Sequence, residues 1–244
     1  APYLEIPKET NPLMGNRGIR LSLDRKNLFK TQIRAIYRAS WYGNLGMMYP
    51  MICAEEEMDE IDEVIREVKK GLDEKQIPYK KVKTGIMIET PAAAILLDEI
   101  LQVPGIDMVH IGLNDLHLAM GMSFMFQLLS DGVVEQLAKK IAAKGIPFGF
   151  GGIARMNSGL LPGSAVLKEH YRLGSSMVIV SRSFCNTDKI KDLDEVRNIF
   201  KVGINEIRTL EYEALAARDY FSNNQQVVNK SVEKIVEIIK AKNS

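Results

Sequence analysis

Two acidic residues stand at points where apolar runs of this sequence end. Glu89 directly follows the apolar residues 86–88, and Asp115 comes shortly after a second apolar run at residues 106–112. If both runs are strands of a parallel sheet, their carboxyl ends meet at the edge where such folds bind ligands. Two carboxylates there, with the amide of Asn114 beside them, suit a hard divalent cation such as Mg²⁺ or Mn²⁺. The sequence therefore predicts a cation site; the alternative is that Glu89 pairs with an arginine and Asp115 caps the segment that follows.

Further candidate residues follow the predicted strand ends. His117, two residues past Asp115, is a candidate base, with a buried structural histidine as the alternative. Gly151 and Gly152 belong to a glycine-rich run that lets backbone approach a ligand closely. Arg155 lies just beyond this run, where it can reach a carboxylate. Arg182 follows the last predicted strand, a place where barrels often bind phosphate or carboxylate groups.

The elements that position these residues alternate between two patterns. Short apolar runs predict strands at residues 45–52, 83–89, 106–112, 146–151 and 177–181. Helical spacing of apolar residues predicts helices at 24–40, with Asp24 as the N-cap, and at 54–72, 91–101, 132–144 and 164–173. Strands that alternate with helices indicate a parallel sheet covered by helices, and near-continuous apolar strands indicate burial on both faces. The predicted fold class is α/β.

The last part of the chain differs from this alternation. Residues 188–244 are highly charged and helical in pattern, and Val232, Ile235, Val236 and Ile239 mark one apolar face. Such a face packs on its own domain or on a partner subunit, whereas the interspersed acidic residues disfavour a membrane-surface role. We therefore expect a helical C-terminal extension after the sheet domain.

Composition excludes several classes of protein. The 244 residues include 46% hydrophobic and 26% charged residues, which is ordinary for a globular chain and untypical of a disordered one. A formal net charge of +1 with mixed signs disfavours a nucleic-acid binder. We see neither a long apolar run nor a secretory signal pattern, and we expect no membrane partner. The two cysteines lack metal-ligand spacing and indicate a reducing compartment, so we expect a cytoplasmic protein.

Two motifs resemble the metal-binding strand ends of the phosphoenolpyruvate/pyruvate barrel superfamily. They are Ile88-Glu89-Thr90-Pro91-Ala92 and Gly112-Leu113-Asn114-Asp115-Leu116. Residues 1–94 are similar to the phosphoenolpyruvate-binding domain of enzyme I, the phosphoenolpyruvate–protein phosphotransferase, through segments 7–12, 15–20, 34–40 and 48–52. Residues from 95 onward resemble the HpcH/HpaI aldolase/citrate lyase family, through segments 103–107, 110–116 and 145–149.

This resemblance implies roles and a fold. Glu89 and Asp115 would bind the metal in either family, Arg17 matches an arginine that grips substrate phosphate, and Asn114 matches an amide that contacts phosphate. A guanidinium fork fits phosphate or carboxylate with two hydrogen bonds. The implied fold is a (β/α) barrel domain over residues 1–187, apparently without the first barrel strands, followed by the helical extension at 188–244.

The departures from the two families leave three functions open. Enzyme I has a cysteine as general acid where this chain has Gly151, so protonation of pyruvate enolate on that route is in doubt. The first reading is a metal-dependent carbon–carbon lyase or aldolase that acts on a 2-oxo acid through a pyruvate enolate. The second is phosphoryl transfer from phosphoenolpyruvate. The third is a catalytically incomplete barrel fragment, or a fusion of two relatives, whose open sheet edges predict a homo-oligomer.

Overall fold

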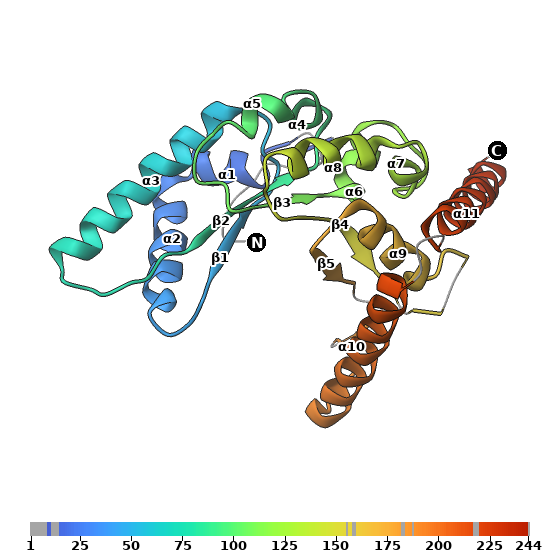
Figure 1. Ribbon diagram of the computed structural model, residues 1–244. Helices are drawn as coiled ribbons and strands as arrows, with labels where there is room; N and C mark the ends of the chain where they lie inside the picture. The colour runs from blue at the N-terminus through green and yellow to red at the C-terminus, as the bar shows by residue number, and fades with distance from the viewer. Residues whose placement is uncertain are drawn as a thin grey trace. The chain divides into compact units, whose positions relative to one another are not determined.

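Five parallel strands form one sheet in the computed structural model, which describes residues 9–10, 15–154, 156–157, 160–181, 184–186, 188–216 and 220–243. The strands lie side by side in chain order (Figure 1). They are β1 (Gly46–Tyr49), β2 (Lys83–Ile88), β3 (Met108–Ile111), β4 (Phe148–Ile153) and β5 (Met177–Val180). Each lies within a predicted strand or overlaps it. The α/β fold class of the (β/α)-barrel type, with a helical C-terminal region, is therefore confirmed.

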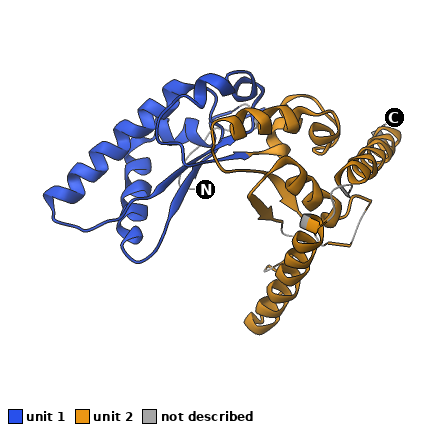
Figure 2. Cartoon of the chain, in the orientation of Figure 1, with its two compact units in different colours: residues 1–110 blue, residues 111–244 orange. Residues whose placement is uncertain are grey.

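Helices connect and cover the strands. They are α1 (Ile19–Asp24), α2 (Lys26–Ser40), α3 (Glu55–Glu74), α4 (Pro91–Ile95), α5 (Leu97–Ile100), α6 (Leu113–Ala119), α7 (Gln127–Ser130), α8 (Val133–Ala143), α9 (Gly163–Leu173), α10 (Leu193–Ala216) and α11 (Tyr220–Asn243). None of these described helices has the length and apolar character that crossing a bilayer requires. The chain divides into two compact units, residues 1–110 and 111–244 (Figure 2).

The first unit contains β1, β2, most of β3 and helices α1 to α5. Strands β1 and β2 pair in parallel, with Gly46 opposite Lys83. Helix α2 buries Phe29, Ile33 and Tyr37, spaced by four residues, and packs against α3. This spacing places the three side chains on one face.

The prediction that Asp24 caps the helix over residues 24–40 is wrong. Gly18 has a φ of 58°, and an additional short helix, α1, begins directly after it and ends at Asp24. Helix α2 then begins at Lys26, and its N-cap Arg25 makes no side-chain capping hydrogen bond. The Asp24 carboxylate instead accepts a hydrogen bond from Asn16 Nδ2 at 3.2 Å. The apolar spacing of α2 did not reveal this break because α1 buries only Ile19.

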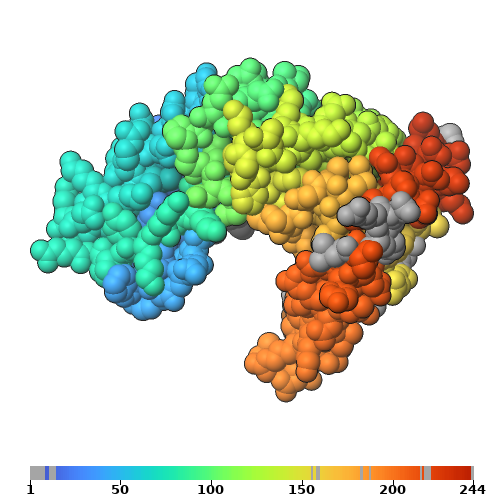
Figure 3. Space-filling model, viewed as in Figure 1, coloured from blue at the N-terminus to red at the C-terminus, as the bar shows by residue number. Residues whose placement is uncertain are grey.

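The second unit contains β4, β5 and helices α6 to α11. Both C-terminal helices, α10 and α11, pack on α9. In Figure 3 the first turns of α10, drawn in orange, project beyond the rest of this unit. Leu193 there is 67% exposed. Gly203 in the middle of α10 allows the ring of Phe184 to lie against the helix, since a Cβ at this position would lie 2.2 Å from Phe184 Cζ.

Candidate functional site

Glu89 is a buried carboxylate at the carboxyl end of β2. Its side chain is 3% exposed, and Oε1 accepts a hydrogen bond from the backbone N–H of Met51 at 2.8 Å. Met51 belongs to the turn that follows β1, the neighbouring strand. The first predicted metal ligand is therefore held at the sheet edge by the backbone of an adjacent connection.

Three side chains tie the segment after β1 to the segment after β2. Cys53 Sγ donates to Met51 O at 3.3 Å and lies 3.4 Å from Thr90 Oγ1. Thr90 Oγ1 accepts from the N–H of Ala93 at 3.1 Å and so caps α4, in which Pro91 occupies the first turn as predicted. Arg20 Nη2 donates to Cys53 Sγ at 3.7 Å. These contacts join residues that are distant in sequence around Glu89.

Arg17 is exposed on a segment that lies against the same turn. The N–H of Ile19 donates to Pro50 O at 3.1 Å, and Arg20 Nη1 donates to Gly15 O at 3.0 Å. The segment 15–20 is thus fixed beside the turn after β1, and Arg17 in this segment is exposed. In the first unit, the segment of Arg17 and the carboxylate of Glu89 therefore both contact the 50–51 turn.

In the second unit, three candidate residues share the short helix α6. Asn114 is exposed, Asp115 in the first turn is half-buried, and His117 is 7% exposed. Nδ1 of His117 lies 3.1 Å from Leu113 O. Because a carbonyl oxygen only accepts, Nδ1 carries the hydrogen, and Nε2 is the atom with basic character. The catalytic role of His117 stays a prediction.

Gly151 occupies a position in β4 that excludes a side chain. Its φ is 51°, and a Cβ there would lie 2.8 Å from Leu113 Cδ1. Gly152 is less restricted, since its Cβ would lie 3.2 Å from Ile179 O. The positive φ and the nearby side chain of Leu113 therefore favour glycine, and disfavour cysteine, at position 151. Arg155 and Arg182, both predicted to bind substrate, lie outside the described residues.

The donor set fits a hard cation through carboxylate oxygens. Within the part of the chain that the structure describes, no group of three or more His, Cys, Asp or Glu side chains gathers to hold a metal. A cation bound by only one or two carboxylates completes its shell with water and ligand oxygens, which is how Mg²⁺ commonly binds. Cation binding by Glu89 and Asp115 stays a prediction. Met51, Cys53 and Thr90 were not among the residues predicted from sequence, because a backbone donor and a left-handed turn leave no pattern of residue types.

Comparison with known proteins adds independent information. The family described as "PEP-utilising enzyme, PEP-binding domain" matches residues 1–127, which extends past the boundary expected at residue 94. Two phosphoenolpyruvate–protein phosphotransferases, from Buchnera aphidicola subsp. Acyrthosiphon pisum and Bacillus subtilis, are 43% and 41% identical over 116 residues. Each match covers 47% of this chain and 20% of the relative, so the chain spans about a fifth of the length of these relatives.

A solved structure supports the fold over a longer part of the chain. A citrate lyase from Burkholderia xenovorans LB400 is similar with a TM-score of 0.50 and 14% sequence identity, over 84% of this chain and 69% of that protein. At this identity the likeness shows the fold alone. The superfamily resemblance is confirmed, and the matches favour the phosphoenolpyruvate alternative over the lyase reading. On the family match across residues 1–127, this chain belongs to the family of PEP-utilising enzymes that share the PEP-binding domain.

Proposed function

We propose that this chain binds phosphoenolpyruvate together with a divalent cation, for which Glu89 and Asp115 supply carboxylate ligands. The observation that carries the proposal is that one family match extends over residues 1–127. Arg17, Glu89, Asn114 and Asp115 all fall within it. The two acids also follow β2 and β3, which are neighbouring strands of the sheet.

In this proposal, different residues of the chain bind the cation and the phosphoenolpyruvate. The N–H of Met51 fixes one oxygen of Glu89 in a buried position. Arg17 extends its guanidinium from the segment against the 50–51 turn and binds the phosphate or carboxylate of the ligand through two hydrogen bonds. The Asn114 amide donates to a phosphate oxygen. When bound, Mg²⁺ or Mn²⁺ supplies Lewis-acid stabilisation of the negative charge on ligand oxygens.

A second candidate function is carbon–carbon lyase activity on a 2-oxo acid, and Gly151 favours it. Phosphoryl transfer from phosphoenolpyruvate leaves a pyruvate enolate that a general acid must protonate. The left-handed backbone of Gly151 and its contact with Leu113 leave no room for a side-chain acid at that position. In the lyase reaction, Nε2 of His117 would take the proton of the 4-hydroxyl group as the carbon–carbon bond breaks and the aldehyde is released. It would then return that proton to the enolate carbon to give pyruvate, so this route needs no acid at position 151.

A titration of Mn²⁺ followed by phosphoenolpyruvate tests the binding proposal. We expect wild type to bind both, Glu89→Gln to lose at least about tenfold in Mn²⁺ affinity, and Arg17→Gln to lose about tenfold in phosphoenolpyruvate affinity alone, since a charge-assisted contact accounts for that factor. Glu99→Gln, at an exposed glutamate of α5, is the matched control and should bind like wild type. Wild type that binds no Mn²⁺, or Glu89→Gln with unchanged affinity, contradicts the proposal.

Turnover separates the two candidate reactions. The phosphotransferase reading predicts release of pyruvate from phosphoenolpyruvate in the presence of an acceptor. The lyase reading predicts release of pyruvate and an aldehyde from 4-hydroxy-2-oxo acids. Pyruvate formation from each substrate is measured by coupling to lactate dehydrogenase, with Glu89→Gln as the inactive control for both.

A further inference from the structure

Met51 adopts a backbone conformation that methionine seldom takes. Its φ is 64°, and among the described residues the only other non-glycine residue with positive φ is Gln76, at 54°. The left-handed region is unfavourable for residues with a Cβ because the side chain approaches the backbone. The Met51 side chain is also buried, with 2% exposed. A conformation that costs free energy and persists in a buried turn needs surroundings that impose it.

This conformation directs the backbone N–H of Met51 toward the carboxylate of Glu89. The Met51 N–H donates to Glu89 Oε1 at 2.8 Å, across 38 residues of sequence. A hydrogen bond to a carboxylate is stronger than one between neutral groups and fixes the rotation of the side chain. Glu89 is almost fully buried, and this hydrogen bond restricts the orientation of its carboxylate.

Contacts on two further sides hold the turn in place. On one side, Cys53 Sγ donates to the carbonyl of Met51 and lies beside Thr90 Oγ1, the residue that follows Glu89. On the other side, the N–H of Ile19 donates to Pro50 O. Gly18 makes room for the Met51 side chain, since a Cβ at Gly18 would lie 2.8 Å from Met51 Cγ. The 50–51 turn is thus fixed both by the segment that carries Arg17 and by the segment that carries Glu89.

We propose that Met51 is a positioning residue, whose left-handed backbone aims its N–H at Glu89 and thereby fixes the carboxylate in the orientation that binds a divalent cation. This inference rests on the proposed function, because it takes Glu89 as a ligand. It assigns the positioning to the backbone at residue 51 and not to the methionine side chain. A substitution that keeps positive φ therefore preserves cation binding, and one that opposes it does not.

Two substitutions at Met51 separate the backbone from the side chain. Met51→Gly and Met51→Val both remove the long side chain, but glycine adopts positive φ readily and a β-branched residue strongly resists it. We expect Met51→Gly to bind Mn²⁺ like wild type, and Met51→Val to bind about tenfold more weakly, as the cost of the left-handed region implies. The matched control is Gln76→Val, at the exposed second position with positive φ, which should leave Mn²⁺ affinity unchanged. Free Mn²⁺ is measured by electron paramagnetic resonance.

A spectroscopic readout keeps the inference testable if Met51→Val does not fold. In the full chain, Glu89→Gln replaces a charged acceptor with a neutral one, so the amide proton of Met51 should move upfield more than any amide outside residues 88–90 and exchange faster. A Met51 amide that does not respond to Glu89→Gln overturns the inference, and so does a folded Met51→Val variant that binds Mn²⁺ like wild type. If wild type binds no Mn²⁺, both the proposed function and this role of Met51 are wrong. If wild type binds Mn²⁺ but the Met51 results are as just described, only the role of Met51 is wrong.

Discussion

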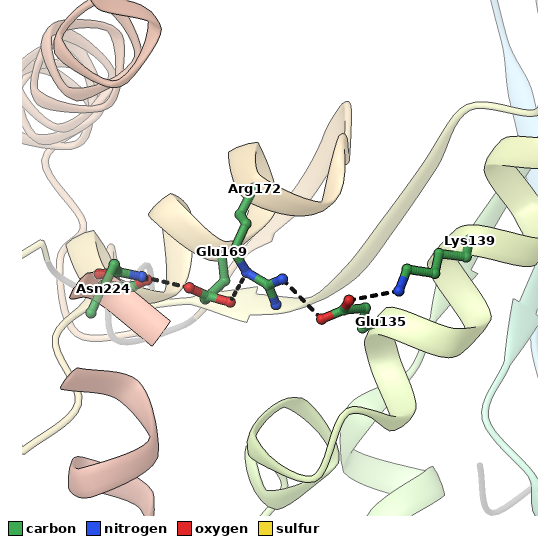
Figure 4. A network of polar contacts seen from close by, with 6 residues as sticks. Glu135, Lys139, Glu169, Arg172 and Asn224 are labelled. Carbon is green, nitrogen blue, oxygen red and sulfur yellow. Dashed lines mark hydrogen bonds and ion pairs between the residues drawn. The ribbon is translucent and has the colours of Figure 1, made fainter. Parts of the chain in front are cut away.

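Two buried glutamates, one in each compact unit, are held by different kinds of partner. Glu169 in α9 is 1% exposed, and its two oxygens accept from Arg172 Nε and from Asn224 Nδ2 of α11, both at 2.7 Å (Figure 4). Arg172 also donates through Nη1 to Glu135 of α8 at 2.9 Å. Glu89 is equally buried, but the hydrogen bond described for it comes from a backbone N–H.

The difference concerns charge as well as geometry. A guanidinium neutralises the carboxylate that it binds, so the contact of Glu169 with Arg172 is an ion pair within α9. A backbone amide contributes a dipole and no net charge, so the hydrogen bond from Met51 to Glu89 is not itself an ion pair. The first arrangement connects α9 with α8 and α11. In the proposed function, the second orients a carboxylate for a cation. The two arrangements should therefore respond in opposite ways to substitution.

The largest effect is expected where a side-chain partner is removed. Arg172→Met leaves the buried charge of Glu169 without its cation, and breaking a buried pair from one side costs about 3–5 kcal/mol. The free energy of unfolding from urea titration measures this change. Lys139→Met is the control, because Lys139 is 74% exposed and pairs with Glu135 at the surface, where such pairs contribute less than about 1 kcal/mol. Equal losses in the two variants would contradict the structural role of the Glu169–Arg172 pair.

The next largest change in stability is expected from altered packing in the second unit. Gly203→Ala places a Cβ 2.2 Å from Phe184 Cζ, and overpacking of this kind costs about 1–3 kcal/mol despite the better helix propensity of alanine. In α3 of the first unit, Gly71 also lies inside a long helix but has nothing within 4 Å of a built Cβ. Gly71→Ala should instead stabilise the protein by about 1 kcal/mol. Thermal denaturation of both variants tests the pair, and a stabilising Gly203→Ala would show that Phe184 moves away freely.

The sequence predicts the features that depend on local residue patterns, and it does not predict those that depend on contacts made in the fold. Strand positions and the α/β class are readable because apolar periodicity reflects burial, and β2 and β3 come out within their predicted ranges. The position of Glu89 at the end of a buried strand is predictable because it directly follows the apolar residues 86–88, whereas its role as a ligand stays a prediction. The left-handed turn at Met51 is not predictable, since its conformation is imposed by Gly18, Ile19 and Cys53, which lie close to it only in the fold.

The local backbone explains why the predicted start of the helix over residues 24–40 is wrong. Asp24 has the right residue type for an N-cap, but the Gly18 backbone begins a separate helix that ends there. In the second unit, Glu169 and Asn224 meet although 55 residues separate them, and neither α9 nor α11 carries a pattern that predicts their pairing. Residue types thus predict which groups are available, whereas the fold decides which of them become partners.

A smaller decrease in the free energy of unfolding is expected at low pH. Hydrogen bonds from Lys139 and from Arg172 hold the pKa of Glu135 below its ordinary value of 4.5. A carboxyl whose pKa is lower in the folded state contributes stability above the ordinary value, and this contribution is lost as the pH falls towards the folded pKa. We therefore expect the contribution of Glu135 to the free energy of unfolding to decrease below about pH 4.5. Urea titrations from pH 3 to 7 should show a smaller decrease in Glu135→Gln; an identical pH profile would contradict the assignment.

The smallest change in stability is expected at Glu89 itself. The carboxamide oxygen of Glu89→Gln can still accept the N–H of Met51, so this substitution should alter the free energy of unfolding by less than about 1 kcal/mol. Cation affinity should nevertheless fall, because a neutral amide is a weak ligand for Mg²⁺. Urea titration of Glu89→Gln beside Arg172→Met measures the difference. If Glu89→Gln destabilises the protein as much as Arg172→Met, the carboxylate of Glu89 belongs to a structural ion pair, and the distinction between the two glutamates is wrong. A variant that is stable but impaired in binding means that the charge of Glu89 is retained for a ligand.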